Sequence, residues 1–246
     1  MNARALIAPA ALLGFALSGF FDGILLHQIL QWHHLLSATG GDLAFQVAAD
    51  GWFHVGMYAI AAAGLGVLWR RRAAMAGRGA GRTVAAWGLI GFGLWHVVDA
   101  VLFHWTLGIH RIRMDAANRL AWDVGWLAAT GLAPLLAGIR LARRPGGGSG
   151  RTATATLAVL AVASGIYAAL PPPGGATVVA FAGGTSTPAA LSAVARAGGT
   201  VQWSDPTGRV FAVDGVPPDA VPGLLSRGAI WVGGAGLPTG CLGWRA

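Results

Sequence analysis

Residues 5–30, ALIAPAALLGFALSGFFDGILLHQIL, contain only two ionisable side chains, Asp22 and His27. A helix needs about 20 apolar residues to cross roughly 30 Å of hydrocarbon, and this stretch is long enough. It lacks the small-x-small cleavage site before a polar region that ends a signal peptide. We therefore expect a retained transmembrane helix.

Four further apolar runs have similar length. They cover approximately residues 51–69, 83–107, 121–141 and 152–170. Over all 246 residues, 55% are hydrophobic and 11% are charged, and the mean hydropathy is +0.60. Soluble domains carry about 25% charged residues, and disordered chains have low hydrophobicity, so both classes are excluded. The composition predicts an α-helical integral membrane protein with five transmembrane helices in the lipid bilayer.

The arginines predict the orientation of these helices. Ten of the 17 lie at the N-terminus or in the loops 70–82 and 140–151, whereas the loops 31–50 and 108–120 together contain three. Because arginine accumulates in cytoplasmic loops, we expect a cytoplasmic N-terminus and an extracytoplasmic C-terminal segment. The net charge of +8 is then a signal of topology, and no nucleic-acid partner is expected.

The chain changes character after the fifth apolar run. The predicted strands are 177–182, 200–204, 209–213 and 229–232, and the predicted helices are 188–197 and 218–226. This βαββαβ order is typical of a ferredoxin-like fold. The segment has no His and only Cys241, which excludes an intrachain disulfide, so we expect a partner-docking module. The expected domains are a four-helix membrane domain (1–145), a fifth helix (146–170), a linker (171–176) and an extracytoplasmic α+β module (177–246).

One ionisable pattern occurs twice. Asp22-Gly-Ile-Leu-Leu-His27 resembles Asp99-Ala-Val-Leu-Phe-His104, and a further His follows six residues later in each case. The second and fourth apolar runs also share a motif, Asp50-Gly-Trp and Asp123-Val-Gly-Trp. These matches predict a two-plus-two helix repeat, followed by one extra helix.

The seven His and the six Asp of the membrane part all fall toward the predicted outer side. An Asp near the bilayer centre costs at least about 2.5–3.5 kcal/mol, so such groups face the bundle interior and mark function. Imidazole and carboxylate groups on facing helices form metal sites in helical bundles. They suit Cu, Zn or Fe. The candidate metal ligands are Asp22, His27, His33, Asp50, His54, His96, Asp99, His104 and His110.

Helical geometry limits which of these residues can meet. At about 100° per residue, His96 and Asp99 share one face of a helix, whereas Asp99 and His104 point about 140° apart. His104 therefore joins Asp99 only if the helix is locally broken. Otherwise it belongs to a second, shallower group.

Structural explanations exist for each candidate. His33, His34 and His110 fit a wet membrane interface among tryptophans. Asp50 and Asp123, like Asp115, fit the first turn of a helix as capping residues. The deeper Asp–His pairs fit hydrogen bonds that hold helices together in lipid.

The run Gly19–His34, followed by Asp50-Gly-Trp-Phe-His54, resembles a bacterial membrane-protein family known as domain of unknown function 2243. The resemblance covers roughly residues 10–140 and includes Val98–His104 and Leu107–His110. The family usually has Glu at position 99, Asn at 96, and further His at 105 and 111. Its members often occur beside or fused to assembly factors of cytochrome oxidase. The resemblance thus implies copper or haem handling in respiratory biogenesis, in the bacterial inner membrane.

Four functions remain open from the sequence. The first is metal handling, with copper foremost, for maturation of a respiratory oxidase. The second is a structural or docking subunit that binds the oxidase or its assembly factors through the C-terminal module. The third is haem b binding, with His27/His104 or His54/His96 as axial ligands. The fourth is a metal-dependent intramembrane hydrolase. Five helices are few for a transporter, so transport would require a homodimer.

Overall fold

The structure, a computed structural model, describes residues 2–169 and 176–233. Cys241 and nearly all of the predicted linker, 171–176, lie outside these residues. The chain forms two compact units. The first unit comprises Met1–Gly23 and His54–Tyr167, and the second comprises Ile24–Phe53 and Ala168–Ala246.

Five helices in the described residues are long and apolar enough to cross a membrane, which confirms that prediction. They span Ala3–Ile29, Leu43–Arg70, Ala80–Thr106, Arg119–Arg143 and Arg151–Ala169. The α-helical segments are α1 (Ile7–Asp22), α2 (Leu43–Arg70), α3 (Ala80–Val98), α4 (Arg119–Trp126), α5 (Ala133–Arg143) and α6 (Arg151–Ala169). Three segments are π-helical, namely η2 (Gly23–Ile29), η4 (Asp99–Thr106) and η5 (Leu127–Leu132). Short 3₁₀ turns span Ala3–Leu6, η1, and Arg72–Ala76, η3.

The second helix begins at Leu43, about two turns before the start predicted near residue 51. Asp42 stands just before it, and its Oδ1 accepts the backbone N–H of Phe45 at 2.9 Å. Asp50 is consequently inside the helix rather than at its start. The predicted start is too late because the polar side chains of Gln46 and Asp50 interrupt the apolar residues in the first two turns of the helix.

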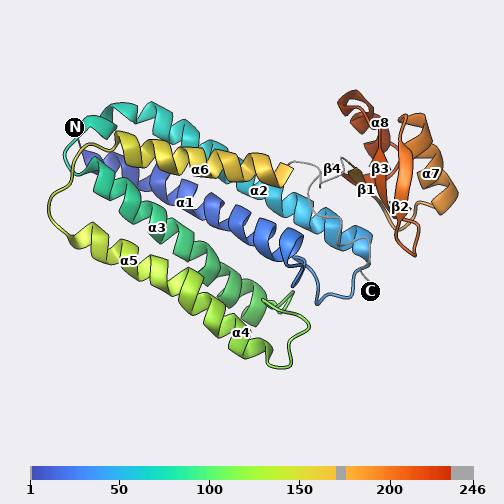
Figure 1. Cartoon of the computed structure of the whole chain (residues 1–246), viewed down its shortest axis with the longest axis horizontal. Helices are drawn as coiled ribbons and strands as arrows, with labels where there is room; N and C mark the ends of the chain where they lie inside the picture. The colour runs from blue at the N-terminus through green and yellow to red at the C-terminus, as the bar shows by residue number, and fades with distance from the viewer. Residues whose placement is uncertain (1, 170–175, 234–246) are drawn as a thin grey trace. The chain divides into compact units, whose positions relative to one another are not determined.

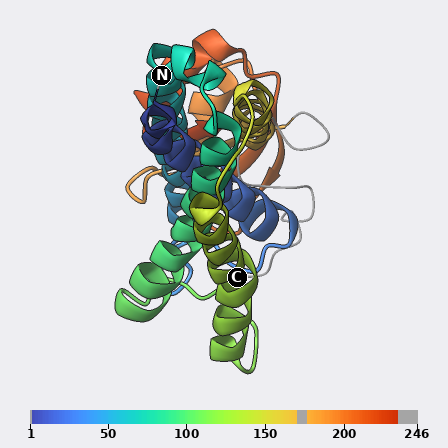
Figure 2. The same ribbon diagram turned by 90° about the vertical axis from the view of Figure 1, so that its left-hand side faces the viewer.

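In the first unit, α3 runs alongside both α1 and α5 (Figures 1 and 2). Small residues bring the backbones close, since a Cβ at Gly14 would collide with the carbonyl of Gly88. A Cβ at Gly91 would likewise collide with the carbonyl of Ala11. Close approach at small residues is typical of helices that pack within a membrane.

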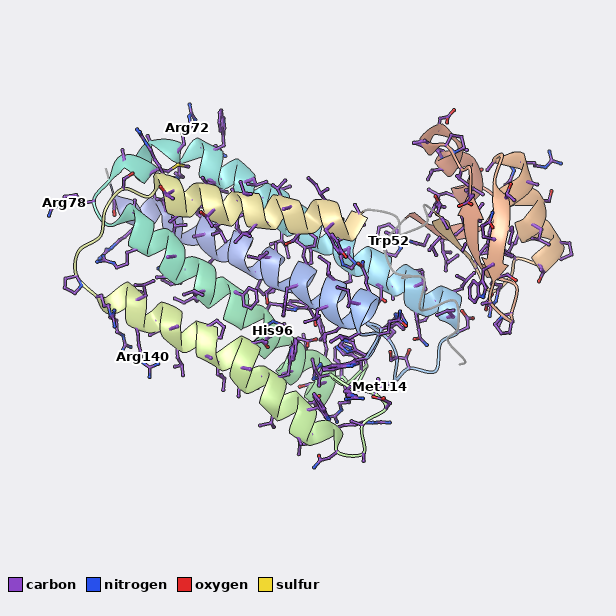
Figure 3. All side chains as sticks on the ribbon, in the orientation of Figure 1. Trp52, Arg72, Arg78, His96, Met114 and Arg140 are labelled. Atoms are coloured by element: carbon purple, nitrogen blue, oxygen red, sulfur yellow. The ribbon has the colours of Figure 1, made fainter. Side chains whose placement is uncertain are left out.

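The two ends of the first unit differ in charge. Figure 3 shows Arg72, Arg78 and Arg140 at one end of the bundle, whereas His96 and Met114 lie toward the other. Between the ends the surface is apolar, with exposed side chains such as Leu89 and Ile166. This distribution fits a bundle whose sides contact lipid.

The second unit contains a four-stranded antiparallel sheet of β1 (Thr177–Phe181), β2 (Thr200–Ser204), β3 (Val210–Asp214) and β4 (Ala229–Gly233). The strand order is β2-β3-β1-β4. Helix α7 (Thr187–Arg196) follows β1, while the 3₁₀ turn η6 (Pro218–Ala220) and α8 (Val221–Leu225) precede β4. The order of elements is therefore the predicted βαββαβ.

Both faces of this sheet are covered within the second unit. On one face, Val179 and Phe211 pack against buried residues of α7 and α8. On the other face, Val178, Ala180 and Val210 pack against Ala44 and Val47 of α2. An ion pair between Arg209 and Asp42 lies at the same contact. The start of α2 and the sheet therefore share one apolar core.

Candidate metal centre

The histidines and four of the aspartates in the apolar helices and their loops are buried. All seven His, together with Asp22, Asp50, Asp99 and Asp123, expose only 1–2% of their surface. The placement of His33, His34 and His110 in a wet interface is therefore wrong. Because burying an ion without partners costs several kcal/mol, these groups must neutralise one another or bind something.

Asp99 and His104 do meet, because the helix changes its winding between them. The segment from Asp99 to Thr106 is π-helical, with hydrogen bonds from residue i to i+5. This winding stacks residues five apart on one face, which an α-helix does not. His104 Nε2 consequently lies 3.0 Å from Asp99 Oδ2. The local break that the sequence left open is this π-helix.

After the π-helix the chain turns back and adds a second imidazole. Gly108 has φ +63°, in the left-handed region that glycine adopts without strain. The turn brings His110 Nε2 to 3.1 Å from Asp99 Oδ1. The rings of His104 and His110 lie 4.7 Å apart at 74°. One carboxylate and two imidazoles thus converge.

Asp123 lies on the other side of His104. Its Oδ1 is 3.1 Å from His104 Nδ1 and accepts the backbone N–H of Ile112 at 3.0 Å. Its Oδ2 accepts Nη1 of Arg111 at 2.8 Å. The helix cap is Asn118 instead, so the explanation of Asp123 as a cap is wrong. We call Asp99, His104, His110 and Asp123 the Asp99 cluster.

Residues 27–50, which belong to the second compact unit, form an arrangement that matches the Asp99 cluster. His27 Nε2 lies 3.1 Å from His33 Nε2, and the rings are 4.7 Å apart at 72°. His27 stands in the π-helical segment η2, and Gln31, with φ +53°, occupies the position that corresponds to Gly108. A non-glycine residue in this region is uncommon, and such strain is concentrated at functional sites.

Asp50 holds the same position in this arrangement as Asp123 in the other. Its Oδ1 lies 3.2 Å from His27 Nδ1 and accepts the backbone N–H of Leu35 at 2.7 Å. Its Oδ2 is 2.6 Å from His34 Nδ1. We call His27, His33, His34 and Asp50 the Asp50 cluster. Asp22 precedes His27 by five residues on the same helix, as Asp99 precedes His104.

Asp99, His104 and His110 form a buried group that could hold a metal ion, and His27 and His33 belong to a second such group. Zinc-like ions bind imidazole nitrogen and carboxylate oxygen at about 2.0–2.2 Å, so tetrahedral ligand atoms lie about 3.4 Å apart. The observed Nε2–Nε2 distance of 3.1 Å in the Asp50 cluster and the Nε2–Oδ distances of 3.0 and 3.1 Å in the Asp99 cluster are close to this spacing. A small outward movement of each side chain would admit an ion.

The two remaining histidines lie outside these groups. The ring of His54 stacks on Phe20 with centroids 6.3 Å apart. His96 packs among Phe21, Phe92 and Trp126, and neither of its ring nitrogens has a hydrogen-bond partner within the described residues.

Sequence reasoning missed two parts of the site. The sequence predicts Asp123 as a capping residue in the first turn of a helix, although its motif matches the one at Asp50 and so points to the site. Arg111 was read only as a loop arginine, because nothing in the sequence showed that it reaches Asp123.

These helices and clusters define a polytopic membrane protein with buried groups that could hold a metal ion. The chain belongs to the family described as "Predicted membrane protein (DUF2243)", whose model matches residues 9–145, more than half of the chain. This match confirms the resemblance, with the module after residue 176 outside it. The chain matches no curated protein and no solved structure.

Proposed function

We propose that this chain is a membrane-embedded metal-binding protein with one ion site in each half. Asp99, His104 and His110 supply the ligands of one site. The convergence of these three side chains in a buried position is the observation that supports the proposal most strongly. By the repeat, His27 and His33 supply imidazole ligands of the other site.

The sequence predicts Asp50 as a metal ligand. In this proposal Asp50 and Asp123 orient the imidazoles instead. Each faces the Nδ1 atom of an imidazole, which leaves Nε2 directed toward the ion. Carboxylates that bind the second nitrogen of a metal-ligating His fix its tautomer and raise its basicity. We therefore assign them an orienting role rather than direct ligation.

We also propose three finer features of the chain. The matched π-helices, left-handed turns and orienting carboxylates favour an ancient duplication of a two-helix unit. The β2-β3-β1-β4 order with two helices on one face favours a ferredoxin-like fold for the C-terminal module. The arginine distribution favours an extracytoplasmic position for the clusters, in the bacterial inner membrane.

The donor set narrows the choice of metal. Two imidazoles and a carboxylate suit Zn²⁺, Cu²⁺ or Fe²⁺ better than the thiolate- and thioether-binding Cu⁺. The family resemblance adds copper handling for a respiratory oxidase as the specific role that we propose. Haem b is less well supported, because both nitrogens of His104 face carboxylates.

A purely structural role is the second candidate. Asp50 and Asp123 are each satisfied by backbone and side-chain donors without any ion. In this alternative the clusters are hydrogen-bonded scaffolds that hold helix ends together, and partner binding is the function of the module.

Metal content of the full-length protein in detergent separates the two candidates. We expect two ions per chain after titration with Zn²⁺ or Cu²⁺, and one ion in the variant His104→Ala/His110→Ala. The control is His96→Ala, which removes an equally buried imidazole outside the clusters and should leave two ions. Protein that contains no metal and takes up no Zn²⁺, Cu²⁺ or Fe²⁺ would overturn the proposal and support the scaffold.

A further inference from the structure

We propose that Arg111 makes the two sites unequal, so that a divalent ion binds more tightly in the first half than in the second. This inference rests on the proposed function, because it concerns the same two sites. Arg111 lowers the ion charge that the second site prefers.

The inequality comes from one position at which the two halves differ in charge. The residue after the second imidazole is His34 in the first half and Arg111 in the second. Both side chains contact the orienting carboxylate, His34 through Nδ1 at 2.6 Å and Arg111 through Nη1 at 2.8 Å. In both halves this carboxylate also faces an imidazole Nδ1 and accepts a backbone N–H. Asp123 in addition accepts the indole N–H of Trp105 at 3.3 Å, which adds no charge to the site.

The substitution changes the charge of the site. Each half contributes two carboxylates, Asp22 and Asp50 in the first and Asp99 and Asp123 in the second. A divalent ion with neutral imidazoles balances the first pair. In the second half the guanidinium of Arg111, which is always protonated, already cancels one carboxylate, so a divalent ion leaves one net positive charge.

The low polarity of the surroundings increases the effect of the Arg111 charge on ion affinity. Asp123 is fully buried and the Arg111 side chain is only one-third exposed. Like charges repel more strongly there than in water. Arg111 also draws electron density from Asp123, which weakens the support that this carboxylate gives to His104. Both effects lower the affinity of the second site for a divalent ion, so the two sites fill in sequence.

Variants that contain a single site test the inference. His104→Ala/His110→Ala leaves only the first site, and His27→Ala/His33→Ala leaves only the second. We expect the first site to bind Zn²⁺ about 10- to 100-fold more tightly, the range typical for changes beside a ligating His. In the second-site background, Arg111→Gln and Arg111→His should each recover most of this difference. In the first-site background, His34→Arg should weaken binding by a similar factor.

The outcomes distinguish the inference from the proposed function. If neither background binds Zn²⁺, the proposed function fails and the inference fails with it. If both bind equally and the substitutions at 111 change nothing, the inference is wrong but the two sites stand. The two Arg111 variants differ in size and polarity, so a loss of folding in one, detected by thermal unfolding, leaves the other as the test. Arg113→Gln, which removes a nearby arginine that pairs with Asp115, is the matched control and should leave both affinities unchanged.

Discussion

Asp123 Oδ1 lies 3.1 Å from His104 Nδ1, while the other nitrogen of the same ring faces Asp99. The imidazole is therefore held between two carboxylates with different tasks. We expect Asp123→Asn to reduce Zn²⁺ affinity at the second site about 10- to 100-fold, because an amide supports the ring orientation but not its basicity. A chelator-competition titration measures the loss.

The matched control for this variant is Asp115→Asn. Asp115 is an exposed carboxylate paired with Arg113 at 2.9 Å, and this hydrogen bond lowers the pKa of its carboxyl. Its removal should leave Zn²⁺ binding unchanged. Equal affinity losses in both variants would show that the effect is long-range electrostatics rather than orientation of His104.

Gly108 offers a test of the turn that returns the second imidazole. No atom lies within 4 Å of a Cβ built at this residue, so Gly108→Ala changes only the backbone preference at φ +63°. A left-handed conformation costs a residue with a Cβ about 1–2 kcal/mol. We expect a stability loss of about 1 kcal/mol and weaker metal binding at the second site. Gly125→Ala, also in open space but helical, should show neither effect.

The tight contact between α1 and α3 predicts a packing effect. Gly91→Ala places a methyl group against the carbonyl of Ala11, and overpacking of this kind typically costs about 1–3 kcal/mol. Thermal unfolding in detergent should show a lowered midpoint. Gly66→Ala, where the added methyl meets nothing within 4 Å, should be neutral. An unchanged midpoint for both variants would contradict the tight contact between α1 and α3 at Gly91.

Asp205 predicts an acid-dependent loosening of the C-terminal module. Burial acts to raise the pKa of its carboxyl, but hydrogen bonds from the Thr207 hydroxyl and from the backbone N–H groups of Thr207, Arg209 and Val210 outweigh it and lower the pKa. The ionised carboxylate therefore stabilises the module above its unfolded pKa of about 3.9, and this stability is lost as the pH falls through the lower folded pKa.

Hydrogen exchange of strands β2 and β3 in the full-length protein measures this effect. After correction for intrinsic rates, protection should fall below about pH 4 in the wild type and should depend less on pH in Asp205→Asn. Asp219→Asn, which alters an exposed acid of the same module, should retain the wild-type profile. A wild-type profile in Asp205→Asn would contradict the assignment.

Much of the fold could be predicted from composition and periodicity. The five apolar helices and the four strands lie within a few residues of their predicted positions, except for the start of α2. The apolar run begins later than the helix because Gln46 and Asp50 lie in its first two turns. Only the structure shows that His27, His34 and the backbone of Leu35 satisfy Asp50 inside the helix.

The site was harder to predict because its geometry departs from the ideal helix. In an α-helix, the five-residue spacing of Asp99 and His104 would place the two side chains on different faces. The residue types between them do not indicate a π-helix. Gln31 gave no sign of its left-handed backbone, whereas Gly108 did. The grouping of ionisable residues was visible in the sequence, but their division into ligands and orienting carboxylates depends on distances.

His104 follows Asp99 by five residues, and the π-helical winding between them brings both side chains to one face of the helix. A relative that keeps this interval but winds as an α-helix would direct the two side chains about 140° apart, although every ionisable residue would still be present. A relative with one residue fewer could keep the pair on one face of an ordinary α-helix, because residues four apart are rotated by only about 40° there. The presence of Asp and His in an alignment is therefore not enough to identify the site, since the interval and the winding decide it together.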